Sequence, residues 1–202
     1  MEGLKIIRFA VVGAGHIGKR HAEMVTRNAD AELVALCDTK SQEECDAGKF
    51  LVPFYQDLNE MLDKEDFDVL CVATPNGLHA EHSLKALEAS KHLVVEKPMA
   101  LNKIDCEKIL FRALEKSKQV FCVMQNRYSP PSVWMKDLIA GGVLGNIYMV
   151  QINCYWNRDD RYYKKEGWKG KLALDGGTLF TQFSHFIDLL YCFTKHGSLL
   201  SL

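Results

Sequence analysis

The sequence lacks several features that would assign it to whole classes of protein. No apolar run approaches the length needed to span a bilayer, and Lys5 and Arg8 interrupt the N-terminal apolar segment that a signal peptide would require. The 25 basic and 26 acidic residues leave a formal charge of −1, so no excess of one sign indicates nucleic acid or a membrane as partner. Internal repeats and low-complexity segments are also missing.

Cysteine occurs, but in none of the patterns that indicate disulfide frameworks or zinc sites. The seven cysteines are scattered without a Cys-x-x-Cys pair, and several lie inside apolar runs, where a free cysteine behaves as a small hydrophobic residue. We therefore expect a reducing, cytoplasmic location and no bound metal. A Gly-x-Ser-x-Gly nucleophile signature is missing as well.

What the sequence does contain is a regular alternation of apolar runs and amphipathic segments over residues 1–126. Strand-like runs cover residues 9–12, 31–38, 52–55, 68–73, 92–96 and 119–124, and helical patterns cover 16–28, 43–50, 78–90 and 103–116, with a further helix capped by Asp57. Such alternation predicts an α/β fold with a doubly wound parallel sheet of the Rossmann type.

Residues 127–202 have a different pattern and predict an incomplete α/β domain. We expect a helix over 130–140, one long strand over 146–155 and a helix over 178–193. A strand of that length needs sheet neighbours, so either another chain supplies them or this chain is a shortened version of a larger protein. Its unpaired edges, together with the apolar face of the last helix, predict association into a homodimer or tetramer.

A Gly-x-Gly-x-x-Gly turn joins the first strand to the first helix. Gly13 allows the tight turn, Gly15 lets the backbone approach a pyrophosphate, and Gly18 lets the helix pack closely on the strand. The helix that begins at His16 and Ile17 would offer its N-terminal amides to the phosphates. A plain tight turn in an α/β protein is the alternative interpretation.

Asp38 follows the last glycine by twenty positions (38 − 18 = 20), where an acid binds the ribose hydroxyls of a dinucleotide. A carboxylate there repels a 2′-phosphate, and no arginine follows it in Thr39-Lys40-Ser41. The sequence therefore favours NAD over NADP, with Lys40 as the one residue that points toward NADP.

Two further residues are candidates for proton transfer. Lys97 follows the fifth strand, at the sheet edge where open α/β sheets bind ligands, and its alternative is a solvated lysine before a helix. His185 shares a helical stripe with Thr181 and Asp188, and its alternative is a purely structural histidine bonded to Asp188. From their position near a helix start, His79 and His82 are expected to be surface or cap residues.

Several motifs occur in the order in which one protein family carries them. They are the Gly13–Gly18 turn, Asp38, Thr74-Pro75-Asn76 with His79, Glu96-Lys97-Pro98, Gln125-Asn126-Arg127-Tyr128, and Asp175-Gly176-Gly177 with His185 and Asp188. Together they resemble the glucose–fructose oxidoreductase / inositol 2-dehydrogenase / MocA (Gfo/Idh/MocA) oxidoreductases. The resemblance extends from the N-terminal strand to about Phe193. The loop from Tyr155 to Gly170 is most similar to members that act on UDP-N-acetyl-glucosaminuronic acid in surface-polysaccharide synthesis.

The resemblance implies oxidation of a sugar or polyol at the junction of two domains, with Lys97 and His185 flanking the reacting carbon. The expected cofactor residues are Gly13, Gly15, His16, Ile17, Gly18, Asp38, Thr74, Pro75, Asn76, His79, Glu96, Lys97, Gln125 and Arg127. The expected substrate residues are Lys97, Arg127, Tyr128, Trp156, Arg158, Asp175, Thr181 and His185.

The chain departs from the family pattern at two places. Thr181 stands where many members carry an acid or an amide, although its hydroxyl can still form hydrogen bonds. Residues 195–202 do not resemble the family's continuation after this helix. The leading hypothesis is an NAD-dependent dehydrogenase acting on a secondary alcohol of a sugar, polyol or sugar nucleotide. The alternative is a non-catalytic nucleotide-binding or assembly protein, or an inactive truncated product.

Overall fold

The structure is a computed structural model that describes residues 5–194. The chain divides into two compact units, the first ending at Val123 and the second beginning at Met124, whereas the sequence pattern places the boundary after Asn126. The expectation about residues 195–202 lies outside the described residues. Within the described range, no helix has the length and apolar character that crossing a membrane requires.

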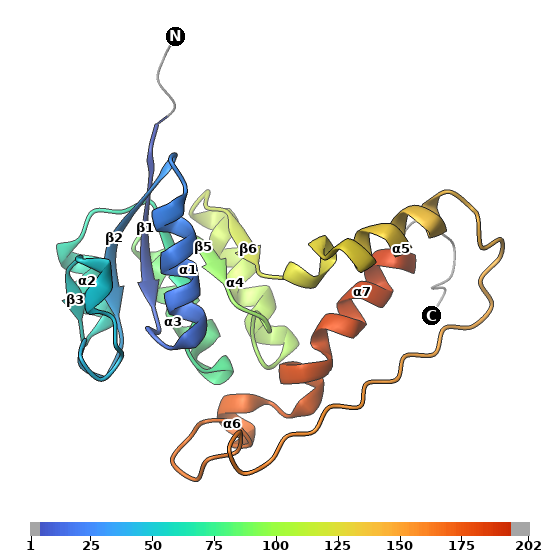
Figure 1. Cartoon of the computed structure of the whole chain (residues 1–202). Coiled ribbons are helices and arrows are strands. Elements are labelled where there is room, and N and C mark those ends of the chain that lie inside the picture. Colours follow the sequence, from blue (N-terminus) through green and yellow to red (C-terminus); the bar gives the residue numbers. More distant parts are fainter. Residues whose placement is uncertain (1–4, 195–202) are drawn as a thin grey trace. The chain divides into compact units, whose positions relative to one another are not determined.

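The first unit is built on a parallel sheet of six strands in the order β3-β2-β1-β4-β5-β6 (Figure 1). The strands are β1 (Ile7–Val12), β2 (Ala31–Cys37), β3 (Phe54–Tyr55), β4 (Val69–Val72), β5 (His92–Val95) and β6 (Val120–Cys122). The helices between them are α1 (His16–Arg27), α2 (Leu58–Lys64), α3 (His79–Glu88) and α4 (Lys103–Glu115). This strand order confirms the predicted Rossmann fold and places the switch point between β1 and β4.

The central residues of the strands are apolar because helices bury both faces of the sheet. Successive residues of a strand point to opposite faces, so Val12 and Leu70 join a core with α2, α3 and α4, while Val11 and Cys71 join another with Ala22 of α1. All four of these strand residues are at most 3% exposed. Burial raises the pKa of the Cys71 thiol to about 12, so this cysteine is a packing residue.

Side-chain caps define where two of these helices begin. Asp57 accepts a hydrogen bond from the Glu60 amide over 3.0 Å at the start of α2, which confirms the expected cap. Asn102 does the same for the Asp105 amide over 2.8 Å at the start of α4. Each cap satisfies an amide that has no partner within its helix.

The predicted helix over residues 43–50 is wrong. Residues 42–46 form turns, and only a 3₁₀ helix, η1 (Gly48–Phe50), follows. The backbone reason is Asp46, whose φ of 50° is left-handed and cannot continue an α-helix. Ser41 nevertheless forms the reciprocal cap expected of a helix start, because its hydroxyl accepts from the Glu44 amide and its own amide donates to the Glu44 carboxylate.

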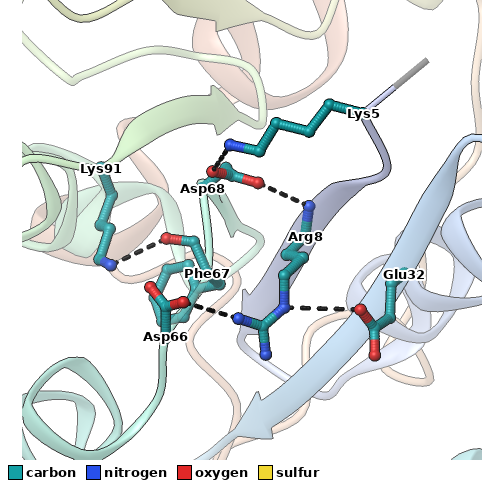
Figure 2. Close-up of polar contacts among 7 residues, drawn as sticks. All are labelled: Lys5, Arg8, Glu32, Asp66, Phe67, Asp68 and Lys91. Atoms are coloured by element: carbon teal, nitrogen blue, oxygen red, sulfur yellow. Dashed lines mark hydrogen bonds and ion pairs between the residues drawn. The ribbon is translucent and has the colours of Figure 1, made fainter. Parts of the chain in front are cut away.

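The amino ends of β1 and β4 are held together by charged groups (Figure 2). The Asp68 carboxylate accepts from the Arg8 amide over 2.9 Å and from Lys5 Nζ over 3.1 Å. The Arg8 guanidinium lies 2.7 Å from Asp66, and Lys91 Nζ donates to the Phe67 carbonyl over 2.8 Å. The Arg8 amide and Lys5 hold the pKa of Asp68 below its ordinary value. These contacts stabilise the edge of the sheet opposite the glycine turn.

The second unit consists of helical segments joined by a long irregular stretch. Its elements are η3 (Gln125–Tyr128), α5 (Pro130–Ala140), α6 (Leu172–Asp175), the π-helix η4 (Leu179–Phe183) and α7 (Ser184–Thr194). Pro130 begins α5 and Gly141 caps its C-terminus, as expected. The predicted helix over 178–193 is also present, but its first part is wound as a π-helix, and α5 packs against α7.

The predicted strand over residues 146–155 is wrong. This segment has no regular secondary structure, and Tyr148, Met149 and Tyr155 are 81–94% exposed. A β-strand requires a hydrogen-bonded neighbour, and within residues 5–194 no strand pairs with this segment. The alternating sequence pattern therefore indicates strand propensity without the partner that would realise it.

Candidate active site

The glycine turn between β1 and α1 is shaped by close backbone contacts. Gly13 has a φ of +92°, and a Cβ there would lie 2.5 Å from the Ala73 carbonyl oxygen at the end of β4. A Cβ on Gly18 would lie 1.7 Å from the Gly13 carbonyl oxygen. Both positions therefore require glycine for the fold itself, the first for backbone conformation and both for space.

Gly15 is different, because a Cβ at this position would have no atom within 4 Å. Its backbone is extended, and it directly precedes α1 as the N-cap residue. His16 and Ile17 are exposed beside it, at the helix start where the first amides have no partner within the helix. Packing therefore does not require glycine at this position. Glycine leaves open space above the N-terminus of the helix, and a phosphate that approaches the helix amides needs this space.

Asp38 lies at the end of β2 and is tied to the glycine turn. Its Oδ2 accepts a hydrogen bond from the Ala14 amide over 2.8 Å, and its Oδ1 accepts from the Lys40 amide over 3.1 Å. The carboxylate is thus held at the carboxyl edge of the sheet, next to the turn whose amides would receive a pyrophosphate. The contact with Lys40 is made by its backbone amide, so it positions Asp38 and does not depend on the charge of the lysine.

His79 joins the loops that follow β4 and β5. It is 1% exposed, and its ring nitrogens lie 2.7 Å from the Pro98 carbonyl oxygen and 2.8 Å from the Thr74 carbonyl oxygen. His82 Nδ1 lies 3.0 Å from Thr74 Oγ1, and burial lowers the pKa of His82. The expectation of surface or cap histidines is therefore wrong for His79, because the helix start faces the sheet edge. Asn76, in the same loop, is also buried.

Glu96 and Lys97 follow β5 at the same edge. The Glu96 carboxylate is 14% exposed, and it accepts from the Lys97 amide over 3.2 Å and contacts His21 Nε2 over 2.9 Å. The Lys97–Pro98 peptide bond is cis, and Lys97 is half-buried. His21 was not among the predicted site residues. Its position one turn after Gly18 on the cofactor-side helix is the sequence signal that could have indicated it.

In the second unit, Arg127 of η3 is paired with Asp188 of α7. Arg127 Nε donates to Asp188 Oδ2 over 2.7 Å, and a second guanidinium nitrogen contacts the other carboxylate oxygen. Asp188 is 12% exposed and Arg127 is 42% exposed. This bidentate geometry is the arrangement in which arginine binds a carboxylate most specifically. Gln125 and Tyr128, on the same short helix, are exposed.

Asp175 and Thr181 support the start of the helix that carries His185. Asp175 is 3% exposed, and its carboxylate accepts from the Gly170 amide over 2.6 Å and the Gly177 amide over 3.1 Å. Thr181 Oγ1 donates to the Gly177 carbonyl over 3.1 Å. His185 is half-buried, one turn after Thr181. These hydrogen bonds of Asp175 and Thr181 therefore stabilise the loop and the helix that carry His185.

The aromatic loop before α6 gathers around Tyr162. The Arg158 guanidinium carbon lies 3.9 Å from the centre of the Trp156 ring and 4.5 Å from that of Tyr162. Gln182 of η4 donates to the Tyr162 hydroxyl over 2.6 Å. Two predicted substrate residues, Trp156 and Arg158, are thereby brought together and joined to the turn that precedes His185.

The structure thus brings the predicted residues together in two groups. At the carboxyl edge of the first unit lie the glycine turn, Asp38, Thr74 to His79, and Glu96 with Lys97. In the second unit, Arg127 pairs with Asp188 of α7, and Arg158, which lies over the Trp156 ring, contacts Gln182 of η4. No group of three or more His, Cys, Asp or Glu side chains suited to a metal ion occurs in residues 5–194.

Known proteins match this chain along most of its length. Residues 7–124 match the family described as "Oxidoreductase family, NAD-binding Rossmann fold" (GFO_IDH_MocA), and residues 133–197 match the "GFO/IDH/MocA C-terminal domain". The D-glucoside 3-dehydrogenase of Escherichia coli is 34% identical over 71% of this chain and 42% of its own length. The glucose-6-phosphate 3-dehydrogenase of Bacillus subtilis is 30% identical over 91% of this chain and 53% of its own.

A solved structure supports the same assignment. The WlbA dehydrogenase from Bordetella pertussis, in complex with NADH and UDP-GlcNAcA, is 36% identical with a TM-score of 0.88. The match covers 94% of this chain and 57% of that one, so the chain spans about half the length of the relatives it matches. From the family match and the Rossmann site geometry, the chain belongs to the Gfo/Idh/MocA family of oxidoreductases.

Proposed function

We propose that this chain is the cofactor-binding and catalytic portion of an NAD-dependent dehydrogenase that oxidises a secondary alcohol of a sugar, polyol or sugar nucleotide. The observation that carries the proposal is the cluster at the carboxyl edge of the first unit. There Asp38 accepts a hydrogen bond from the glycine turn, and the Glu96 carboxylate accepts one from the backbone amide of Lys97. Ligands bind at this edge of open α/β sheets.

Different residues of the chain would carry out the separate steps of an alcohol oxidation. NAD, when bound, accepts the hydride that leaves the alcohol carbon. Lys97, as a neutral amine, would take the proton from the alcohol oxygen, and His185 is the second candidate for this proton. The amides at the start of α1 would bind the pyrophosphate, and Asp38 would accept hydrogen bonds from the adenosine ribose.

Asp38 also supports NAD over NADP as the cofactor. Its carboxylate occupies the position where a 2′-phosphate would carry a like charge, and like charges in close contact are strongly unfavourable. Lys40 contacts Asp38 through its backbone amide, so this contact brings no positive charge to the ribose position.

For the substrate, the relatives indicate where to begin. By their names, one relative acts on D-glucosides and another on glucose 6-phosphate, and the WlbA structure contains UDP-GlcNAcA. The WlbA match covers 94% of this chain and therefore extends beyond the Rossmann fold into the second unit. We therefore take UDP-N-acetyl-glucosaminuronic acid as the first substrate to test, with glucose 6-phosphate and inositol as comparisons.

Lys97→Met tests the proposal, because it keeps the side-chain length and removes the amine. NADH formation should fall at least about a hundredfold, the lower range of general acid–base effects, while NADH binding measured by fluorescence is retained. Lys103→Met is the matched control, since Lys103 lies on α4 and is 86% exposed. If Lys97→Met turns over at an unchanged rate, the role of proton acceptor belongs to His185 or to another group.

The non-catalytic alternative makes a different prediction in the same assay. A nucleotide-binding or assembly protein would bind NADH and oxidise none of the sugars. The relatives favour the dehydrogenase, because the three relatives described above are dehydrogenases.

We further propose that the protein is a cytoplasmic homo-oligomer, a dimer or tetramer, in which the exposed apolar side chains of residues 146–155 are covered. Light scattering at micromolar concentration tests this oligomeric state.

A further inference from the structure

Two cationic side chains share one aromatic ring in the second unit. Lys169 Nζ lies 3.8 Å from the centre of the Tyr162 ring, and the Arg158 guanidinium carbon lies 4.5 Å from the same centre. Both distances are within the range of cation–π contact. Like charges repel, so two cations gather on one ring only if the surroundings, or a ligand, offset their repulsion.

The charge of this pair is incompletely balanced by the described residues. Across residues 5–194, neither Arg158 nor Lys169 lies within ion-pair distance of a carboxylate. Asp175 is the acidic residue whose charge acts on Lys169 and raises its pKa. Its carboxylate also accepts hydrogen bonds from the Gly170 and Gly177 amides. Burial and the charge of Arg158 lower the pKa of Lys169, which is the response of an amine whose positive charge lacks compensation.

The pair is held in place by neighbours that do not neutralise it. Gln182 donates to the Tyr162 hydroxyl over 2.6 Å, and the Arg158 guanidinium contacts the Gln182 oxygen over 3.4 Å. Gln182 belongs to η4, one turn before His185. Arg158 Nε is buried and has no hydrogen-bond partner within the described structure. An anionic acceptor on a ligand would satisfy this N–H donor.

We propose that Arg158 and Lys169 form a binding site for an anionic group of the substrate, a carboxylate or a phosphate, on the segment that leads to His185. The site rests on the proposed function and narrows it to acidic substrates. Arg158 provides the directed donors and Lys169 the point charge, a division that matches the geometry of carboxylate and phosphate recognition. Tyr162 holds both cations within 4.5 Å of the centre of one ring.

Calorimetry with the 202-residue chain tests the site, using three probes. UDP-GlcNAcA and UDP-GlcNAc differ by one carboxylate, and UDP carries the diphosphate alone. Lys169→Gln should weaken UDP-GlcNAcA binding about tenfold or more, as expected when a hydrogen bond to a charged group is lost. Arg158→Gln should act in the same direction. The exposed Lys165→Gln, in the same loop, is the matched control and should leave binding unchanged.

The three probes distinguish the two sources of negative charge. If the carboxylate occupies the site, the unmodified chain prefers UDP-GlcNAcA to UDP-GlcNAc, and Lys169→Gln removes this preference. If the diphosphate occupies it, Lys169→Gln weakens all three probes equally. The proposal is overturned if Lys169→Gln changes none of them, if Lys165→Gln causes the same loss, or if no probe binds the unmodified chain at millimolar concentration.

Two further measurements separate this proposal from its foundation. Circular dichroism and NADH binding are recorded for each variant, so a misfolded variant is recognised and excluded from the comparison. A chain that binds NADH and oxidises a neutral sugar while ignoring every anionic probe keeps the proposed function and loses the anion site. A chain that binds the acidic probe through Lys169 without any NADH binding loses the function and keeps the site.

Discussion

The Ala14 amide donates a hydrogen bond to Asp38 Oδ2 over 2.8 Å, which joins the glycine turn to the end of β2. The residue expected to bind the adenosine ribose is therefore also one that shapes the phosphate-binding turn. Substitutions of Asp38 are expected to change ribose recognition and turn geometry together, and a suitable pair of variants separates the two.

Asp38→Ala should weaken NADH binding by roughly 1.5–3 kcal/mol and reduce the preference for NADH over NADPH, because it removes hydrogen bonds to a charged acceptor. Asp38→Asn keeps an oxygen for the Ala14 amide and removes the charge, so it should mainly affect the cofactor preference. Fluorescence titration with both cofactors measures this, with the exposed Asp30→Ala as control. Equal affinity of the unmodified chain for NADH and NADPH would contradict the assignment of Asp38.

Gly15→Ala and Gly18→Ala form a matched pair on one turn. A methyl group on Gly15 has open space within 4 Å, so the melting temperature should be preserved while NADH binding weakens. A methyl group on Gly18 would lie 1.7 Å from the Gly13 carbonyl, so the free energy of unfolding should fall by roughly 1–3 kcal/mol, as in overpacked cores. Thermal melts and NADH titrations of both variants test this, and unchanged NADH binding by Gly15→Ala would remove the role given to that position.

Asp188→Asn should destabilise the second unit by about 1 kcal/mol, because it removes the charge that pairs with Arg127. The effect is kept small by the exposure of Arg127, which is 42%. Urea unfolding followed by tryptophan fluorescence measures it, with the exposed Asp137→Asn on α5 as control. If Asp188→Asn and Asp137→Asn unfold at the same urea concentration, the pair does not contribute to stability.

The stability of the first unit should fall as the pH decreases below about 6.5, the ordinary pKa of histidine. Burial lowers the pKa of His82; nearby Glu81 opposes this shift, and Lys85 and His79 add to it. The folded chain therefore keeps His82 neutral where the unfolded chain already binds a proton. Stability is lost progressively from the unfolded pKa down to the lowered folded pKa.

His82→Gln should reduce this pH dependence, because glutamine can contact Thr74 without titrating. Urea midpoints at about pH 7.5 and about pH 5.5 measure the difference between the two proteins. The exposed His16→Gln is the control, and it should leave the pH dependence as it is in the unmodified chain. A pH dependence that is equal in all three proteins would assign the effect to other groups.

Some failures of sequence-based prediction have a common physical cause. The alternation over residues 146–155 reports side-chain preference, but a strand also needs a hydrogen-bonded neighbour, and the described residues supply none. In residues 43–50 the reciprocal cap at Ser41 is present, yet the left-handed backbone at Asp46 ends the helix before it forms. Both patterns are locally correct and are overruled by the surrounding chain.

The sequence by itself determined the Rossmann sheet, its helices and the glycine turn, because these depend on local periodicity, caps and glycine positions. Only the tertiary structure decided the pairs that join distant residues: His21 with Glu96, His79 with Pro98, and Arg127 with Asp188. The same holds for Lys169 and Arg158 on Tyr162. These contacts depend on where the fold places two segments and on the charge and burial of the partners, and none of these leaves a periodic signal in the sequence.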